Sequence, residues 1–215
     1  MAAERHRLGR RHLLLGGGAV GAAALCGAGY AARDRLERLW WRLPGTEVER
    51  TEGEVDHPDA EWVPAASANY RRASRPYDYA IDRVIIHVAQ ATYQVTLNVF
   101  QNPSHGAAAH YVVRSVDGRI AQTVRELDVA YHAGNVEYNE RSVGIEHEGW
   151  VDRPQYLTDA LYQSSARLTA GICDRYNIPK DREHIIPHSA VPGSDHTDPG
   201  PLWDWDRYLR LVRAA

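Results

Sequence analysis

The segment Arg83–Val88, with the sequence RVIIHV, constrains the fold of this chain more than any other segment. Its aliphatic residues form a nearly continuous run, which is typical of a short strand buried on both faces of a sheet. Such a strand requires other elements to cover both of its faces. His87 lies near the end of the run, where a side chain can project into a cleft. The segment therefore predicts a central strand that ends at a candidate functional residue.

Further patterns surround this strand with turns and helices. Asp117-Gly118 is a strong hairpin signal between two apolar segments, and Thr158 is a suitable N-cap residue for the amphipathic segment that follows it. Residues 92–101 fit either a helix or a strand. The other expected elements are strands at 110–114, 119–124, 143–148 and 184–187, and helices at 158–176 and 204–212. Strands mixed with helices predict an α/β sheet with helices packed against its faces.

The segment 187–200 carries the residues that most clearly indicate chemistry. It contains two histidines and two aspartates among prolines and glycines, which prevent long regular structure. A stiff loop of this kind holds imidazole and carboxylate groups at fixed separations. Zinc binds both groups, and a catalytic zinc site has three protein ligands and one open position. Two ligands from this loop require a third from elsewhere, and His87 is the best candidate.

Six short segments, taken in order, resemble one enzyme family. They are VIIH at 84–87, AHYVV at 109–113, YHAG at 131–134, SVGIEHEG at 142–149, HSAVPG at 188–193 and TDPG at 197–200. The set is similar to the zinc-dependent N-acetylmuramoyl-L-alanine amidases of the amidase-2 type, which are related to a bacteriophage lysozyme and to the peptidoglycan recognition proteins. The resemblance implies one α/β domain at 67–215, with a mixed central β-sheet flanked by helices and a helix at 92–101.

The resemblance also implies a set of site residues. His87, His188 and Asp198 match the metal ligands, so the expected cofactor is Zn²⁺. Glu146 and Glu148 alternate along one strand and should face the same side, and chemistry alone does not choose between them. The family pattern assigns the catalytic carboxylate to Glu146, which would accept a proton from a water activated by the metal. Glu148 is then a supporting or solvated group.

Other polar residues have more than one interpretation. His196 stands two residues before the aspartate ligand, where many relatives have a lysine that steadies the oxyanion, and histidine can donate the same hydrogen bond. A solvent-exposed loop histidine is its alternative. His132 is expected to contact the substrate or to orient its loop, and Asn69 and Tyr70 are expected to border the substrate cleft.

Three further histidines have expected roles away from the chemistry. His110 and His184 are expected to be structural, although an exposed position is the alternative for His184. His147 should point to the opposite face from Glu146 and affect packing more than chemistry.

The expected activity is zinc-dependent hydrolysis of the amide bond between N-acetylmuramic acid and L-alanine, in peptidoglycan or muropeptides. The alternative is a non-catalytic peptidoglycan-binding module. Such modules commonly lack a metal ligand, whereas this chain retains all three candidates and Glu146. The net charge of −3 and the absence of a basic stripe give no case for a nucleic-acid partner. We expect a monomer.

The N-terminal residues have the composition of a targeting segment and a stem. Residues 1–32 combine a basic head with an uncharged run that begins at Leu13, and Arg10-Arg11 resembles a twin-arginine export signal. Because the run is also long enough to span a bilayer, a membrane anchor is the alternative to an exported, extracellular or cell-wall protein. Residues 33–66 are expected to be a linker. With only Cys26 and Cys173, a structural disulfide is not expected, and Cys173 is interpreted as a core residue.

Overall fold

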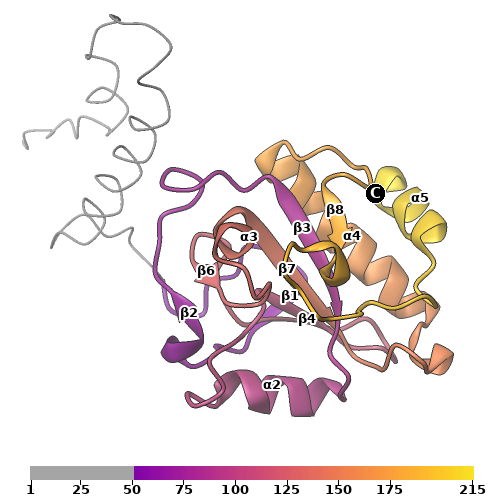
Figure 1. The fold of residues 1–215 in the computed structure, drawn as a ribbon, viewed down its shortest axis with the longest axis horizontal. Coiled ribbons are helices and arrows are strands. Elements are labelled where there is room, and N and C mark those ends of the chain that lie inside the picture. Colours follow the sequence, from indigo (N-terminus) through magenta and orange to yellow (C-terminus); the bar gives the residue numbers. More distant parts are fainter. Residues whose placement is uncertain (1–50) are drawn as a thin grey trace, which may run out of the picture. The chain divides into compact units, whose positions relative to one another are not determined.

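A computed structural model describes residues 51–215 and contains a mixed central sheet (Figure 1). Within these residues, the sheet has six strands in the order β1-β5-β4-β7-β3-β8. Neighbouring strands are parallel except for the antiparallel pair β4 and β5. The strands are β1 (Ala60–Trp62), β3 (Arg83–Val88), β4 (Tyr111–Val113), β5 (Ile120–Gln122), β7 (Ser142–His147) and β8 (Ile185–Pro187). Short strands β2 (Tyr70–Arg71) and β6 (Val129–Ala130) form a separate antiparallel pair. The mixed α/β sheet is therefore confirmed.

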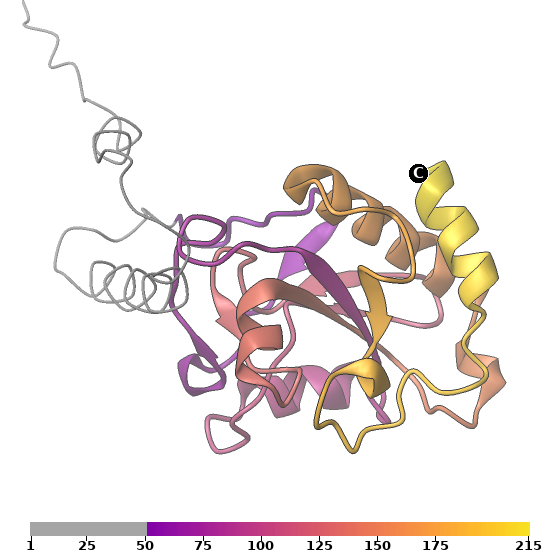
Figure 2. The same ribbon diagram turned by 45° about the horizontal axis from the view of Figure 1, so that its top comes forward.

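Two helices cover one face of the sheet, α4 (Asp159–Tyr176) and α5 (Trp205–Ala214), as Figures 1 and 2 show. The alternation of side chains along each strand selects this face. Val84, Ile86 and Val88 of β3 join Val143 and Ile145 of β7 in one buried cluster with residues of α4 and α5. This cluster is the main hydrophobic core.

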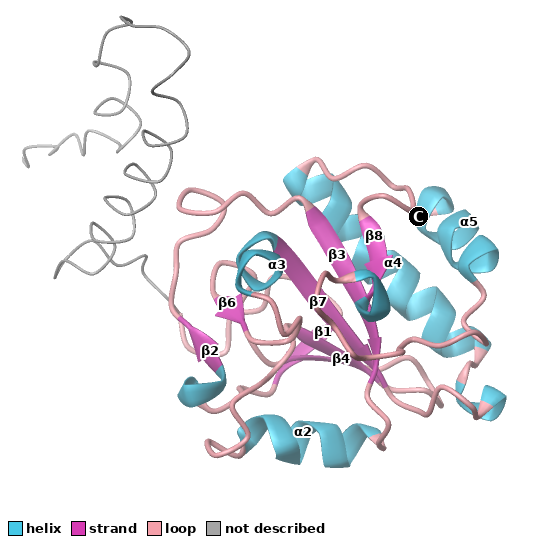
Figure 3. Ribbon diagram, viewed as in Figure 1, coloured by secondary structure: helices cyan, strands magenta, loops and turns pink. Residues whose placement is uncertain are grey.

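The opposite face of the sheet is covered only in part by helix, as the secondary-structure colours of Figure 3 show. Helix α2 (Tyr93–Gln101) packs through Leu97 and Phe100 against Val112 and Ala121 of the sheet. The remaining elements are the helix α3 (Val136–Arg141) and the 3-10 turns η2 (Ser67–Asn69), η3 (Pro154–Tyr156) and η4 (His188–Ala190). His87 and Glu146 belong to this second face, because they alternate with the residues that face the main core.

The helix boundaries follow from local capping. The Thr158 hydroxyl oxygen accepts a hydrogen bond from the backbone N–H of Leu161 at 3.1 Å, as an N-cap residue does. Asn177 closes α4 in the left-handed conformation with φ at 56°. Asp204 caps α5 through the N–H of Arg207 at 2.9 Å. The helices expected at 92–101, 158–176 and 204–212 are confirmed within one or two residues.

The predicted hairpin is also present, and its glycine has two functions. Gly118 has a φ of 72°, which favours glycine in the turn between β4 and β5. A Cβ atom there would lie 2.3 Å from the Ser164 Oγ and 2.6 Å from the Ala160 carbonyl oxygen. The turn therefore packs against α4 at a distance that only glycine permits.

The folded domain begins earlier than residue 67, so the predicted linker boundary is wrong. Strand β1 adds to the sheet beside β5. Asp56 donates its backbone N–H to Gln122 Oε1 at 2.7 Å and accepts the N–H of Glu126 at 2.9 Å, and His57 is buried. This segment has no hydrophobic period because polar contacts and one three-residue strand attach it to the domain.

The expected export signal or anchor at 1–32 and the linker residues up to 50 lie outside the described residues. Among the helices at 51–215, none combines the length and the hydropathy that a bilayer crossing requires. Cys173 is buried in the core, as expected.

Candidate metal centre

Two parallel strands and one loop bring together the three candidate ligands. β3 pairs with β8, with Ile86 opposite Pro187, so His87 and the residue that follows β8, His188, lie side by side. Their ring centroids are 4.4 Å apart. The loop before α5 returns to this strand end and places Asp198 against both rings. All three residues are buried.

The distances among the ligand atoms suit a tetrahedral metal site. The Nδ1 of His87 lies 3.3 Å from Oδ2 of Asp198, and the Nδ1 of His188 lies 3.1 Å from Oδ1 of Asp198. Two ligands that are each about 2.0–2.1 Å from a tetrahedral zinc are separated by about 3.3 Å. One ligand atom from each residue falls within a group no more than 4.8 Å across. The residues therefore fit a divalent ion of the zinc type, with two imidazole nitrogens and one carboxylate.

The electrostatics of the centre favour the protonation states that metal binding needs. Burial alone would raise the pKa of Asp198, but the hydrogen bond from the Nδ1–H of His188 outweighs burial, and the pKa lies far below its usual value. Burial lowers the pKa of His87, which favours the neutral ring. The backbone N–H of Val88 also donates to Oδ2 of Asp198 at 3.3 Å. An ionised carboxylate and a neutral imidazole are the forms that bind metal.

The register of β3 and β7 places a carboxylate next to this group. His87 lies opposite Glu146, and the Oε2 atom of Glu146 is buried without a hydrogen-bond partner. Burial, followed by the negative charge of Asp198, raises the pKa of Glu146 well above its usual value. A nearby divalent cation acts in the opposite direction, because it stabilises the carboxylate form.

The structure distinguishes Glu146 from Glu148. The Glu148 carboxylate accepts hydrogen bonds from the backbone N–H groups of Tyr93 at 3.0 Å and Ser115 at 2.8 Å, so it fastens α2 and the β4–β5 turn to the end of β7. Glu146 instead lines a cavity together with the candidate ligands His188 and Asp198.

That cavity has a volume of about 810 Å³ and lies between α2 and the 188–198 loop. Its wall combines the candidate site with apolar and polar groups from several loops. The residues that line it include Gln90, Phe100, His105, Tyr131, His132, Asn139, Glu146, His188, His196 and Asp198. A cavity of this size accommodates a substrate larger than a single amino acid.

Known proteins share both the sequence and the fold of this domain. Residues 77–201 match the family model described as N-acetylmuramoyl-L-alanine amidase. N-acetylmuramoyl-L-alanine amidase A of Achromobacter lyticus is 35% identical over 178 residues, which cover 75% of this chain and 97% of that protein. The chain belongs to the N-acetylmuramoyl-L-alanine amidase family.

Two further matches in this amidase family involve AmpD proteins. The 1,6-anhydro-N-acetylmuramyl-L-alanine amidase AmpD of Escherichia coli (strain K12) is 39% identical over 111 residues, which cover 49% of this chain and 58% of that protein. A crystal structure of an AmpD selenomethionine derivative matches with a TM-score of 0.60 and 28% identity, and the match covers 77% of this chain and 99% of that one. The family and the fold implied by the sequence are thus both confirmed.

His196 lies at the rim of the cavity, where the amidase resemblance implies a cation. Its ring stacks on His188, with the centroids 4.1 Å apart and the planes 26° apart. Its Nδ1 lies 3.5 Å from Oδ1 of Asp198. The side chain is 59% exposed, so its ring can reach a molecule bound in the cavity.

His132 also lies in the cavity wall, but its ring nitrogens have partners within the protein. Its Nδ1 is 3.0 Å from Nε2 of His87, and its Nε2 is 3.2 Å from the Ser142 hydroxyl. Burial, followed by the neighbouring His87 and His110, lowers the pKa of His132 well below its usual value. Of the two roles expected for His132, these contacts favour orientation within the protein over direct hydrogen bonding to the substrate.

The prediction that Asn69 borders the cleft is wrong, because its side chain is buried and makes only internal contacts, and Tyr70 is not among the residues that line the cavity. Asn69 is fully buried, donates to the carbonyls of Phe100 and Asn102 at 2.7 and 3.0 Å, and accepts the N–H of Gly106 at 2.9 Å. It therefore ties the end of α2 to the loop that follows it. Tyr70 packs against the cluster beneath α2.

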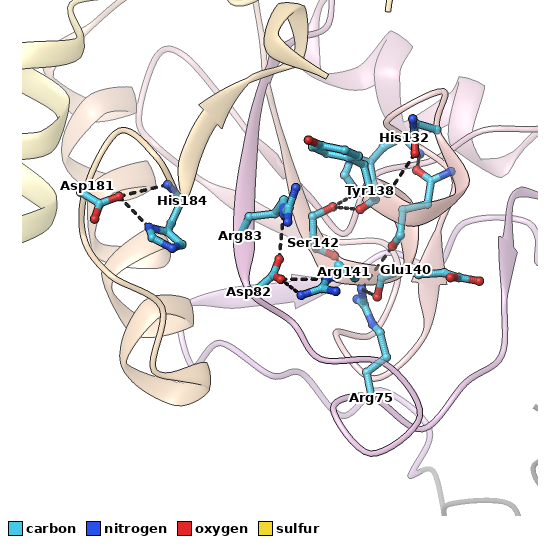
Figure 4. Close-up of polar contacts among 12 residues, drawn as sticks. Arg75, Asp82, Arg83, His132, Tyr138, Glu140, Arg141, Ser142, Asp181 and His184 are labelled. Atoms are coloured by element: carbon cyan, nitrogen blue, oxygen red, sulfur yellow. Dashed lines mark hydrogen bonds and ion pairs between the residues drawn. The ribbon is translucent and has the colours of Figure 1, made fainter. Parts of the chain in front are cut away.

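The three histidines that were expected to be structural, His110, His147 and His184, have contacts within the protein, as predicted. His184 pairs with Asp181 at 2.7 Å (Figure 4) and lies apart from the labelled His132. His110 accepts the N–H of Gly144 at 3.0 Å within the buried interior. His147 faces the main core, where it packs against Trp203 with the centroids 4.6 Å apart.

Sequence reasoning missed two supporting residues, Ser142 and Asn139. Ser142 contacts the His132 ring, and the Asn139 Oδ1 accepts the backbone N–H groups of His132 and Ala133 at 3.0 and 2.8 Å. Ser142 begins one of the matching family segments, which is the only signal that pointed to it. Asn139 lies in a short polar helix and has no distinguishing pattern.

Proposed function

We propose that this chain is a zinc-dependent amidase that hydrolyses the bond between N-acetylmuramic acid and L-alanine. The observation that carries the proposal is the convergence of His87, His188 and Asp198 into one group, with Glu146 opposite His87 and in the wall of the same cavity as His188 and Asp198. The relatives named above supply the reaction, since their names describe N-acetylmuramoyl-L-alanine amidases. The complete set favours an enzyme over a module that only binds peptidoglycan.

The metal ligands and the carboxylate divide the chemistry between them. A zinc ion held by His87, His188 and Asp198 would supply Lewis acidity and lower the pKa of water at its open position to about 7. Glu146 accepts a proton from the attacking water, because its Oε2 is shielded and free of internal partners. Glu146 then returns the proton to the amine that leaves, so one carboxylate serves as base and then as acid.

His196 is proposed to stabilise negative charge on the amide oxygen. Its exposed ring stands over His188 at the cavity rim, where an N–H can donate to that oxygen. Substituting His196→Lys provides a charged group over a wider pH range. The ratio of activity at neutral pH to activity at acid pH should therefore be higher for His196→Lys than for the native chain. Superimposable profiles from acid to neutral pH would contradict this role.

Mass spectrometry of soluble products tests the proposal directly. The full chain, loaded with zinc, is incubated with purified peptidoglycan and, separately, with soluble 1,6-anhydro-muropeptides, and a chelated sample serves as the control. We expect free stem peptides that begin with L-alanine only in the zinc-loaded sample. The two substrate arms show whether intact wall or a soluble fragment is preferred.

Two variants make this assay specific. Glu146→Gln removes the proposed base and should abolish product, whereas His184→Gln removes a histidine outside the cavity and should retain activity. Binding to the wall without release of peptides, under conditions where zinc is bound, would contradict hydrolysis and favour a recognition module.

We also propose that residues 1–32 direct export to the cell wall. The support is the basic head with Arg10-Arg11 before an uncharged run. Replacing both arginines with lysine keeps the charge but removes the twin-arginine pattern, so fractionation should show retention inside the cell. Undiminished export of the lysine variant would contradict the twin-arginine route. Recovery of the exported chain in the membrane fraction would indicate an anchor.

A further inference from the structure

A series of buried polar contacts leads from the metal ligand His87 to the backbone of α3. The Nε2 of His87 is 3.0 Å from the Nδ1 of His132. The Nε2 of His132 is 3.2 Å from the Ser142 Oγ, and the Ser142 hydroxyl donates to the carbonyl oxygen of Tyr138. Figure 4 shows Ser142 beside Tyr138. The series links β3, β7 and α3 through the buried side chains of His87, His132 and Ser142.

The direction of every hydrogen bond in this series follows from its last member. A carbonyl oxygen only accepts, so the Ser142 hydroxyl hydrogen points to Tyr138. The Ser142 oxygen is then an acceptor for the Nε2–H of His132. A neutral imidazole with its hydrogen on Nε2 has an unprotonated Nδ1. His87 must therefore donate its Nε2–H to His132, which leaves its own Nδ1 with a free lone pair.

We propose that His132 and Ser142 are positioning residues that fix His87 in the Nε2–H form and thereby present its Nδ1 to the metal. This inference rests on the proposed function, because it concerns the metal site of the same enzyme. The Nδ1 of His87 is the atom that faces Asp198, at 3.3 Å. The other nitrogen of a histidine ligand commonly donates to a fixed acceptor, which sets the tautomer and the ring orientation.

The surroundings of His132 hold its ring in the required place. Its backbone N–H and that of Ala133 both donate to the Asn139 side chain. Gly144 lies against the ring, where a Cβ atom would be only 2.4 Å from Nδ1. The ring is thus confined between its own fixed backbone and the backbone of β7 at Gly144, which has no side chain. His132 has little freedom to turn its acceptor nitrogen away from His87.

Zinc affinity, measured by competition with a chromophoric chelator, tests the role of His132 without any substrate. His132→Leu removes the acceptor and should weaken zinc binding by about 10–100-fold. His132→Asn should restore most of the affinity, because its Oδ1 can occupy the position of the ring Nδ1. His57→Leu is the matched control, since His57 is a buried histidine whose Nδ1 contacts Asp59 instead, and it should bind zinc as the native chain does.

Nuclear magnetic resonance of the native chain provides a second readout. Two-bond proton–nitrogen correlation spectra of ¹⁵N-histidine protein, assigned with a His87→Gln variant, report which ring nitrogen carries the hydrogen. We expect the Nε2–H form of His87 both without metal and with zinc bound. Ser142→Ala should weaken zinc binding and permit a second tautomer of His132 in the metal-free spectrum. These spectra decide the question even if His132→Leu does not fold.

Several outcomes would overturn the proposal. One is native affinity in His132→Leu, and another is an equal loss of affinity in the leucine, asparagine and His57 variants. A spectrum that places the hydrogen on Nδ1 of His87 in the native chain would also overturn it.

Failure of the proposed function looks different, since it would be seen as zinc binding with the expected variant pattern but without release of stem peptides. A native chain that binds no zinc would overturn both proposals.

Discussion

Replacing His147 with leucine tests how much a neutral, buried and hydrogen-bonded histidine on the main core face contributes to the free energy of unfolding. The His147 ring is fully buried on the main core face. Its Nδ1 donates to the His87 carbonyl at 2.7 Å, and its Nε2 contacts the Ser165 hydroxyl at 2.6 Å. Two buried hydrogen bonds contribute about 0.5–1.5 kcal/mol each. We therefore expect His147→Leu to lower the free energy of unfolding by about 2 kcal/mol at pH 8.

Acidification should remove this difference in the free energy of unfolding. Burial lowers the pKa of His147 from 6.5 to about 3, so the unfolded chain takes up a proton at this residue before the folded chain does. The native chain therefore has its full stability above pH 6.5 and loses stability as the pH falls toward 3. The loss from this group is about 1.4 kcal/mol at pH 5.5 and about 2 kcal/mol at pH 5. Leucine takes up no proton, so the stabilities of the two chains should become equal near pH 5.

Urea unfolding of metal-free protein, followed by circular dichroism between pH 8 and pH 5, measures this difference. A chelator in every sample removes any contribution of bound metal. The other buried histidines titrate equally in both chains, so the difference between the two free energies isolates His147. A difference that stays constant from pH 8 to pH 5 would refute the assignment of a neutral, buried imidazole at this position.

Three further substitutions test the packing and the chemistry of the site. Gly144→Ala places a Cβ atom 2.4 Å from the His132 ring and should lower the free energy of unfolding by about 1–3 kcal/mol. Gly171→Ala is the control, because Gly171 lies in α4 and its added Cβ would meet no heavy atom closer than 3.9 Å. Thermal unfolding should show a lower Tm for Gly144→Ala and a higher Tm for Gly171→Ala. Glu146→Gln should reduce kcat by about 100-fold or more. The same substitution should raise the Tm of the metal-free chain at pH 8. Burial and the charge of Asp198 raise the pKa of Glu146, so an ionised carboxylate at this position opposes folding, and glutamine carries no charge. Asn69→Ala removes three hydrogen bonds and should lower stability by about 1.5–4.5 kcal/mol, while chelator competition should show unchanged zinc affinity if its role is confined to the α2 loop.

Periodicity and turn residues predicted most of the fold. The run at Arg83–Val88 is the central strand, and the capped segment after Thr158 is the long helix of the main core. Residues 51–66 were assigned to a linker because they have no repeating apolar pattern. Their attachment depends on Asp56 and a three-residue strand, and neither feature produces a period that a sequence window can detect.

The sequence predicted some residues of the candidate site correctly and misassigned or missed others. The resemblance to the amidase family identified His87, His188, Asp198 and Glu146, and the structure brings all four together. Asn69 was misassigned, because a polar residue that binds a loop internally looks the same in sequence as one that binds a ligand. The contact between His132 and His87 joins residues 45 positions apart, and it depends on the absence of a side chain at Gly144. Such a contact becomes visible only when the strand register is known.

The register of β3 and β7 explains how one pair of strands serves both folding and chemistry. Alternate residues of β7 point to opposite faces, so Gly144 lies against His132 and Glu146 lines the cavity, while Ile145 and His147 face the core side. His87 is consequently held from both faces. Its ring is bonded to His132 in the site, and its carbonyl is bonded to His147 beneath the sheet. An aliphatic residue in place of His147 would leave the ring contact intact but remove the support of the backbone. Because the metal ligand is restrained at the ring and at the backbone by separate groups, its position depends on the sheet itself more than on the loops that surround the cavity.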